Sequence, residues 1–150
     1  MKRFNIRVYG VLLDSEQGVL VTDEERFGMK FTKFPGGGLE FGEGIKDCLL
    51  REYEEELNQK IEVVDHFYTT DYFQQSAFNK NDQLISVYYL VKPVGEYAFK
   101  ISSASFDFDP SESEEPQSFR FIPVENLSEN DFTFPVDKLV AKMIRSKFAS

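Results

Sequence analysis

The chain has 150 residues, of which 41% are hydrophobic and 29% charged, which is the composition and length of one globular domain. One cysteine, Cys48, and one histidine, His66, exclude a disulfide framework and any metal site built from several residues of either type. A net charge of −9 argues against nucleic acid and anionic membranes as partners. Since no apolar run is long enough for a membrane span and the N-terminus is a poor signal peptide, we expect a cytoplasmic location.

The first part of the chain predicts a β-hairpin followed by irregular backbone. Apolar and β-branched residues indicate strands over 4–13 and 19–22, with a polar turn between them. Residues 23–33 are polar and predict a loop. The run Phe34-Pro35-Gly36-Gly37-Gly38 then interrupts regular structure, because a glycine triplet after proline allows a sharp turn or a close backbone approach.

The rest of the chain mixes helices and strands. Apolar residues at helical spacing predict helices over 45–57 and 134–148, and Asn58 is placed to cap the first. Strands are expected over 61–73, 84–94 and 119–124, with a polar loop at 74–82 and an acidic, irregular segment at 102–118. Because no linker divides this pattern, the sequence predicts a single α/β or α+β domain over residues 1–150 with a mixed sheet.

A run of glutamates on the first predicted helix requires an explanation. In Arg51-Glu52-Tyr53-Glu54-Glu55-Glu56, the spacing places Glu52, Glu55 and Glu56 on one helix face. Their mutual repulsion and their position toward the C-terminal end of the helix both destabilise the helix. A divalent cation such as Mg²⁺ would reverse both effects, because it takes oxygen ligands. The alternative interpretation is a solvated face rich in helix-forming residues.

The spacing of this segment resembles the Nudix box, Gly-x5-Glu-x7-Arg-Glu-U-x-Glu-Glu-x-Gly-U, in which U is a bulky aliphatic residue. The matching residues are Gly37, Glu43, Arg51, Glu52, Glu55 and Glu56. Tyr53 departs mildly at an apolar position, and Asn58 and Gln59 replace the last glycine and the last aliphatic residue. These departures concern the end of the helix rather than the glutamates.

The resemblance implies an α/β/α sandwich with a catalytic loop–helix–loop. It also implies a hydrolase that uses Mg²⁺ or Mn²⁺ to cleave a nucleoside diphosphate linked to another moiety. The metal ligands would be the Gly36 carbonyl and the carboxylates of Glu52, Glu55 and Glu56, and Glu55 and Glu56 would also take part in catalysis. Arg51 and Glu43 match positions that orient the helix carboxylates and brace the loop, so Gly37 and Glu43 are expected to be structural.

Two further groups of residues are expected to serve such a site. Family members often bring one more carboxylate from the segment before the last strand, and Glu115 occupies the corresponding position, although a solvated acidic loop explains this segment equally well. Arg26, Lys30 and Lys33 form a basic group that could hold substrate phosphates, although a solvated basic loop explains them equally well. The sequence does not identify the substrate. It is compatible with a homodimer. The alternative function is a nucleotide-binding sensor without turnover.

Overall fold

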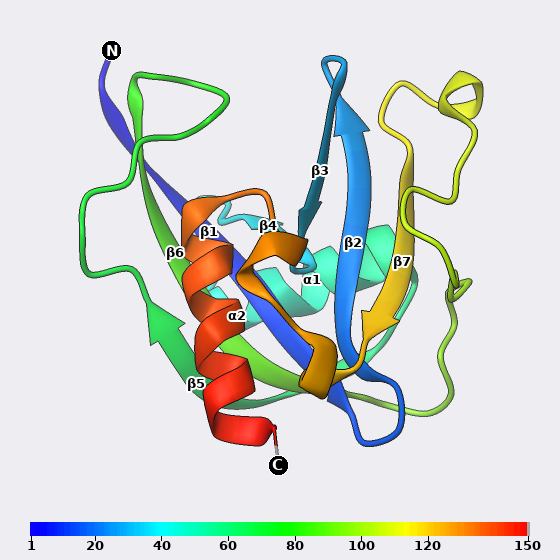
Figure 1. The fold of residues 1–150 in the computed structure, drawn as a ribbon. Coiled ribbons are helices and arrows are strands. Elements are labelled where there is room, and N and C mark those ends of the chain that lie inside the picture. Colours follow the sequence, from blue (N-terminus) through cyan, green and yellow to red (C-terminus); the bar gives the residue numbers. More distant parts are fainter. Residues whose placement is uncertain (150) are drawn as a thin grey trace. The chain divides into compact units, whose positions relative to one another are not determined.

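The computed structural model describes residues 1–149 (Figure 1). The chain divides into two compact units. The first unit comprises Met1–Leu12 and Pro35–Ala98, and the second comprises Leu13–Phe34 and the chain from Phe99 onward. The assignment of residues 1–150 to one Nudix domain stays a prediction. The units are described one at a time.

The first unit contains a mixed sheet. Strand β1 (Arg3–Asp14) runs parallel to β6 (Asp82–Pro93), and β5 (Ile61–Thr69) lies antiparallel to β6. The short strand β4 (Gly36–Gly38) pairs antiparallel with β1. The predicted mixed sheet is therefore confirmed, although β5 ends before the expected residue 73. The backbone leaves the ladder after Thr70, whose amide still donates to the Ser86 carbonyl at 3.0 Å.

Helix α1 (Ile45–Leu57) has the bounds that the sequence predicts. Asn58 adopts the left-handed conformation, with φ 52° and ψ 34°, and ends the helix. Tyr53 is buried, and its hydroxyl donates to the Gly10 carbonyl at 3.1 Å. A Cβ at Gly10 would lie 2.7 Å from the Tyr53 ring, so only glycine lets the ring approach β1 this closely. These contacts fix the position of α1 against β1.

Gln59 explains one departure from the box pattern. Its side chain is buried, and its Oε1 accepts a hydrogen bond from the Ala98 amide at 2.8 Å. Its Nε2 donates to the carbonyls of Lys60 at 2.9 Å and of Val94 at 3.4 Å. A buried amide with these partners is stable, and it ties the 94–98 segment to the end of α1. An aliphatic residue here would leave the Ala98 amide without this acceptor.

The second unit has an antiparallel sheet in which β2 (Gly18–Arg26) lies between β3 (Met29–Lys33) and β7 (Gln117–Ile122). Leu13 and Asp14, at the end of β1, also pair with β2. The prediction of a loop over 23–33 is wrong, because this segment forms the hairpin of β2 and β3. Its turn is Phe27-Gly28, with φ angles of 54° and 74°.

The polar residues of this hairpin are paired rather than solvated, which is why composition misled the prediction. Asp23 is fully buried and accepts hydrogen bonds from Arg120 at 2.7 and 3.2 Å. It also accepts from the Thr32 hydroxyl at 2.6 Å and from the Phe106 amide at 3.2 Å. A buried carboxylate is tolerated when a cation and hydrogen-bond donors surround it. The network joins β2, β3, β7 and the 99–109 segment.

Helix α2 (Pro135–Phe148) closes the chain in agreement with the sequence, except that Phe134 is the residue before the helix. Pro135 occupies the first turn, where a missing amide hydrogen costs nothing. Val136, Val140 and Ile144 are buried along one face. Short 3-10 helices precede it at Pro110–Glu112, Val124–Asn126 and Glu129–Asp131. Within residues 1–149, neither α1 nor α2 has the length and apolar character that crossing a membrane requires.

Candidate active site

The glycine strand β4 presents two backbone carbonyls on the side away from β1. The Gly10 amide donates to Pro35 and the Leu39 amide donates to Ile6, both at 2.9 Å. Bonded and non-bonded pairs alternate in an antiparallel ladder, so Gly36 and Gly38 belong to the non-bonded pairs and their carbonyls point away from β1. The Gly38 carbonyl accepts from the Arg51 guanidinium of α1 at 3.1 Å. The Gly36 carbonyl therefore points toward the same edge as α1.

The carboxylate of Glu52 lies directly against Gly37. A Cβ at Gly37 would come within 2.5 Å of the Glu52 carboxyl carbon and Oε1. No side chain fits there unless the carboxylate moves. The box glycine at this position is therefore explained by the space that the Glu52 carboxylate occupies, and not by a backbone conformation that favours glycine.

Arg51 connects the loop to the helix carboxylates. Its Nη2 donates to Glu43 at 2.7 Å, and its Nη1 donates to Glu52 at 3.0 Å and to Glu55 at 3.1 Å. The hydrogen bonds from Arg51, and then the Glu40 backbone, lower the pKa of Glu43 to about 2. Hydrogen bonding to Glu43, followed by that to Glu52, raises the pKa of Arg51. These hydrogen bonds join the loop to the helix, and the orienting roles expected of Arg51 and Glu43 stay predictions.

The remaining glutamates of the run differ in their surroundings. Glu54 and Glu55 are exposed, whereas Glu56 is half-buried. The pKa of the Tyr53 hydroxyl is raised, first by burial and further by Glu56 and Tyr97. Glu56 therefore lies at the edge of the buried part of the first unit, and Glu54 projects into solvent.

These groups fit a divalent cation by their chemistry. Carboxylates at i, i+3 and i+4 together with a backbone carbonyl are the oxygen ligands that Mg²⁺ prefers. The contact between Glu52 and Gly37 brings one carboxylate against the strand that carries the Gly36 carbonyl. Among residues 1–149, no three His, Cys, Asp or Glu side chains already stand close enough to hold a metal. Here Arg51 bridges Glu52 and Glu55.

Sequence reasoning missed Arg7, which lies on β1 opposite Gly38. The pKa of its guanidinium is raised, chiefly by Tyr9 beside it and further by Glu52 and Glu56. No local pattern marks Arg7, because its place in the site depends on the pairing of β1 with β4. The buried Cys48 borders the same loop, and burial raises the pKa of its thiol to about 12. Cys48 therefore behaves as a core residue.

The other predicted residues belong to the second unit. Lys33 is buried, with its ammonium 3.3 Å from the Glu24 carboxylate, so it does not form part of an exposed basic rim. Lys30 is exposed, and its ammonium lies 5.5 Å from the centre of the Phe106 ring. The Arg26 guanidinium lies 3.4 Å from the Glu115 carboxylate. The structure thus pairs Arg26 and Glu115, which were predicted to have separate roles.

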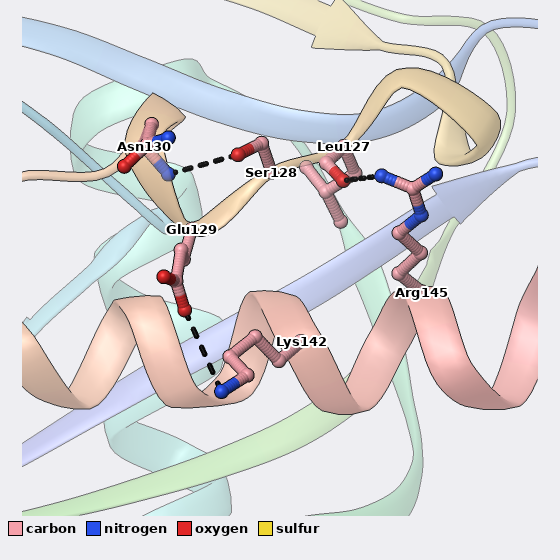
Figure 2. A pocket seen from close by; sticks show the side chains of 6 residues that line it. All are labelled: Leu127, Ser128, Glu129, Asn130, Lys142 and Arg145. Atoms are coloured by element: carbon pink, nitrogen blue, oxygen red, sulfur yellow. Dashed lines mark hydrogen bonds and ion pairs between the residues drawn. The ribbon is translucent and has the colours of Figure 1, made fainter.

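A pocket in the second unit is a weaker candidate (Figure 2). Leu127, Ser128, Glu129, Asn130, Lys142 and Arg145 line it. Lys142 pairs with Glu129 at 3.6 Å, and Arg145 donates to the Leu127 carbonyl at 3.1 Å. Its charged groups already have protein partners, and none of the box residues lines it. We therefore place the candidate active site at the β4–α1 loop and helix.

A family model described as NUDIX domain matches residues 3–143. No curated protein matches the sequence.

Solved structures resemble the chain over nearly its whole length. A MutT protein from Methanosarcina mazei has a TM-score of 0.71 and 14% identity, covering 99% of this chain and 98% of its own. A NUDIX hydrolase from Nitrosomonas europaea has a TM-score of 0.68 and 16% identity, covering 96% and 89%. An ADP-ribose pyrophosphatase from Streptococcus suis has a TM-score of 0.61 and 16% identity, covering 97% and 92%. At these identities the likeness establishes the fold, and the predicted α/β class is confirmed.

Proposed function

The chain belongs to the NUDIX domain family, and on that premise we propose that it is a Mg²⁺- or Mn²⁺-dependent hydrolase of nucleoside diphosphate derivatives. Hydrolysis of a pyrophosphate bond is the general activity that the family match and the named neighbours support. One observation carries the proposal for this chain. The Glu52 carboxylate lies so close to Gly37 that any Cβ there would displace it. Such close placement is what a metal ligand needs.

Four groups would hold the cation in this proposal: the Gly36 carbonyl and the carboxylates of Glu52, Glu55 and Glu56. When bound, the cation would neutralise phosphate charge and make water a better nucleophile. Arg51 keeps Glu52 and Glu55 oriented through its Nη1, and Glu43 holds Arg51 in turn. Removal of Glu43 should therefore disturb the helix carboxylates without touching them.

Glu115 is proposed as an additional carboxylate for the reaction, and Arg26 and Lys30 as a rim for substrate phosphates. The ion pair between Arg26 and Glu115 is exposed, so it contributes little to stability and can exchange for other partners. Glu115→Gln should lower kcat more than tenfold with little change in KM, whereas the nearby Glu112→Gln should have no effect. Full turnover in Glu115→Gln would remove this residue from the mechanism.

Glu56→Gln tests the metal site directly. The change keeps the size of the side chain and removes one ligand charge, so activity should fall about 100-fold or more while the fold is retained. Glu54→Gln is the matched control, because Glu54 belongs to the same run but is exposed on another face. Equal losses in both variants would mean that the run acts through bulk charge alone.

Identifying the substrate requires an assay of several candidate compounds. Nucleoside triphosphates, nucleotide sugars, dinucleoside polyphosphates and ADP-ribose should be assayed with Mg²⁺ for phosphate or nucleotide release. The competing proposal is a sensor domain that binds a nucleotide without turnover. Tight nucleotide binding by calorimetry, with no release over hours at high enzyme concentration, would favour the sensor. Retention of Glu52, Glu55 and Glu56 together supports the enzyme.

A further inference from the structure

Arg7 reaches the glycine strand β4 that Glu52 also contacts, but from the opposite face of that strand. Arg7 is opposite Gly38 in the β1–β4 ladder, and Val8 is opposite Gly37. A Cβ at Gly38 would be 3.2 Å from the Arg7 Nη1. The Arg7 guanidinium and the Glu52 carboxylate therefore approach neighbouring glycines of one short strand. Successive strand residues face opposite sides, so the two groups reach β4 from its two faces, and the missing side chains leave room for each.

Tyr9 holds the Arg7 guanidinium in place. The Arg7 Nε donates to the Tyr9 hydroxyl at 3.2 Å, and the Cζ atom lies 6.0 Å from the centre of the Tyr9 ring. Tyr9 is itself buried, and its ring packs on that of Tyr88 at 5.2 Å. Residues i and i+2 of a strand share a face, so β1 presents Arg7 and Tyr9 together. A guanidinium held this way loses little entropy when it binds a ligand.

The terminal nitrogens of Arg7 differ from those of Arg51. Arg51 donates to Glu43, Glu52, Glu55 and the Gly38 carbonyl. Within residues 1–149, the side-chain hydrogen bond of Arg7 runs from Nε to Tyr9, so its Nη donors are available to a ligand. Glu52 and Glu56 also raise the pKa of Arg7, after the larger effect of Tyr9, so these proposed metal ligands lie within electrostatic range of its charge. A positive charge there disfavours a bound cation and favours an anion.

We infer that Arg7 is a substrate-binding residue whose Nη atoms donate to a non-bridging oxygen of the diphosphate held at the glutamate cluster. The planar fork of arginine matches the oxygens of phosphate, and such charge-assisted bonds are strong. The inference rests on the proposed function, since it assigns a phosphate contact within the same site. It adds a residue outside the box and separates Arg7 from the bracing role of Arg51.

Arg7→Gln tests the inference through two affinities that should move differently. Calorimetry with methylenediphosphonate in excess Mg²⁺ should show affinity reduced about tenfold or more, the scale of lost bonds to a charged group. Titration with Mn²⁺ alone should show affinity unchanged or higher, because a neighbouring positive charge is removed. A general collapse of the site would lower both affinities. With the substrate found in the panel, KM should rise more than kcat falls.

Lys92→Gln is the matched control. It removes the same charge from the first unit, at an exposed ion pair with Glu62, and should leave both affinities unchanged. Arg7→Lys keeps the charge and loses the fork, so its diphosphonate affinity should lie between those of wild type and Arg7→Gln. If Arg7→Gln does not fold, Arg7→Lys decides: affinity equal to that of wild type would overturn the inference.

The inference and the proposed function can fail separately. A wild-type protein that binds no Mn²⁺ and hydrolyses nothing in the panel would reject the proposed function, and with it the role of Arg7. A wild-type protein that binds Mn²⁺ and hydrolyses substrate, while Arg7→Gln keeps wild-type diphosphonate affinity and KM, would overturn only the inference.

Discussion

Gly37→Ala adds one methyl group at the point where the Glu52 carboxylate meets β4. The new Cβ would lie 2.5 Å from that carboxylate, and ordinary contact begins at 3.4 Å, so the carboxylate must move by about 0.9 Å. The φ angle of Gly37 lies outside the left-handed region, so the backbone itself accepts alanine. The perturbation therefore acts on the position of Glu52 and not on the conformation of the strand.

A displacement of about 1 Å in a reacting group can cost about 100-fold in rate, which is about 2.7 kcal/mol. We therefore expect kcat/KM of Gly37→Ala to fall by about that factor, with weaker Mn²⁺ binding. Stability should change little, since the loss of contact opposes the gain of about 0.4–1 kcal/mol that alanine brings by restricting the unfolded chain. Steady-state kinetics, Mn²⁺ titration and thermal unfolding would measure the three quantities.

Two comparisons make this prediction specific. Gly38→Ala is the same change one residue along, where the nearest atom is the flexible end of Arg7 at 3.2 Å, so Mn²⁺ affinity should be retained. In a Glu52→Ala background the clash has no target, so adding Gly37→Ala should cost no further activity. If Gly37→Ala keeps wild-type metal affinity and turnover, the close contact has no functional meaning and the reasoning is refuted.

Two further predictions concern Glu43 and Cys48. Because its folded pKa of about 2 lies below the ordinary 4.5, ionised Glu43 stabilises the protein above pH 4.5, and this stability is lost as pH falls toward 2. Between pH 4.5 and 2, the melting temperature should fall more steeply with pH for wild type than for Glu43→Gln. Equal slopes would contradict the lowered pKa of Glu43. Cys48 is buried with a pKa of about 12, so a thiol reagent at pH 8 should react only upon unfolding. Reaction of the native protein at the rate of a free thiol would show that the loop opens.

The features that sequence predicted well depend on local spacing. Helix α1 was predicted with the bounds that the structure has, because apolar residues at helical spacing lie between Gly44 and a capping Asn58. The box pattern predicts a bracing role for Arg51 and Glu43, and the two side chains are hydrogen bonded in the structure, while the role itself stays a prediction. In each case the information lies within a few turns of one helix and the loop before it.

The features that sequence missed depend on which strands pair. The sequence predicts a loop in place of the β2–β3 hairpin, because Asp23 and Glu24 look solvated until Arg120 and Lys33 are placed beside them. Lys33 was assigned to a basic rim for the same reason. Arg7 reaches the site only through the register that puts it opposite Gly38. Composition cannot distinguish a charge in water from a charge buried against its partner.

The Asp23 network also constrains the order in which the chain can acquire its structure during synthesis. Asp23 and Arg120 are 97 positions apart, so the carboxylate leaves the ribosome long before its cation exists. A buried charge without its partner costs about 3–5 kcal/mol, so β2 and β3 cannot settle into their final packing at that stage. The first unit, in contrast, is fully synthesised by Ala98. We therefore expect nascent chains that end before β7 to protect the first unit from proteases while the β2–β3 hairpin is still cleaved.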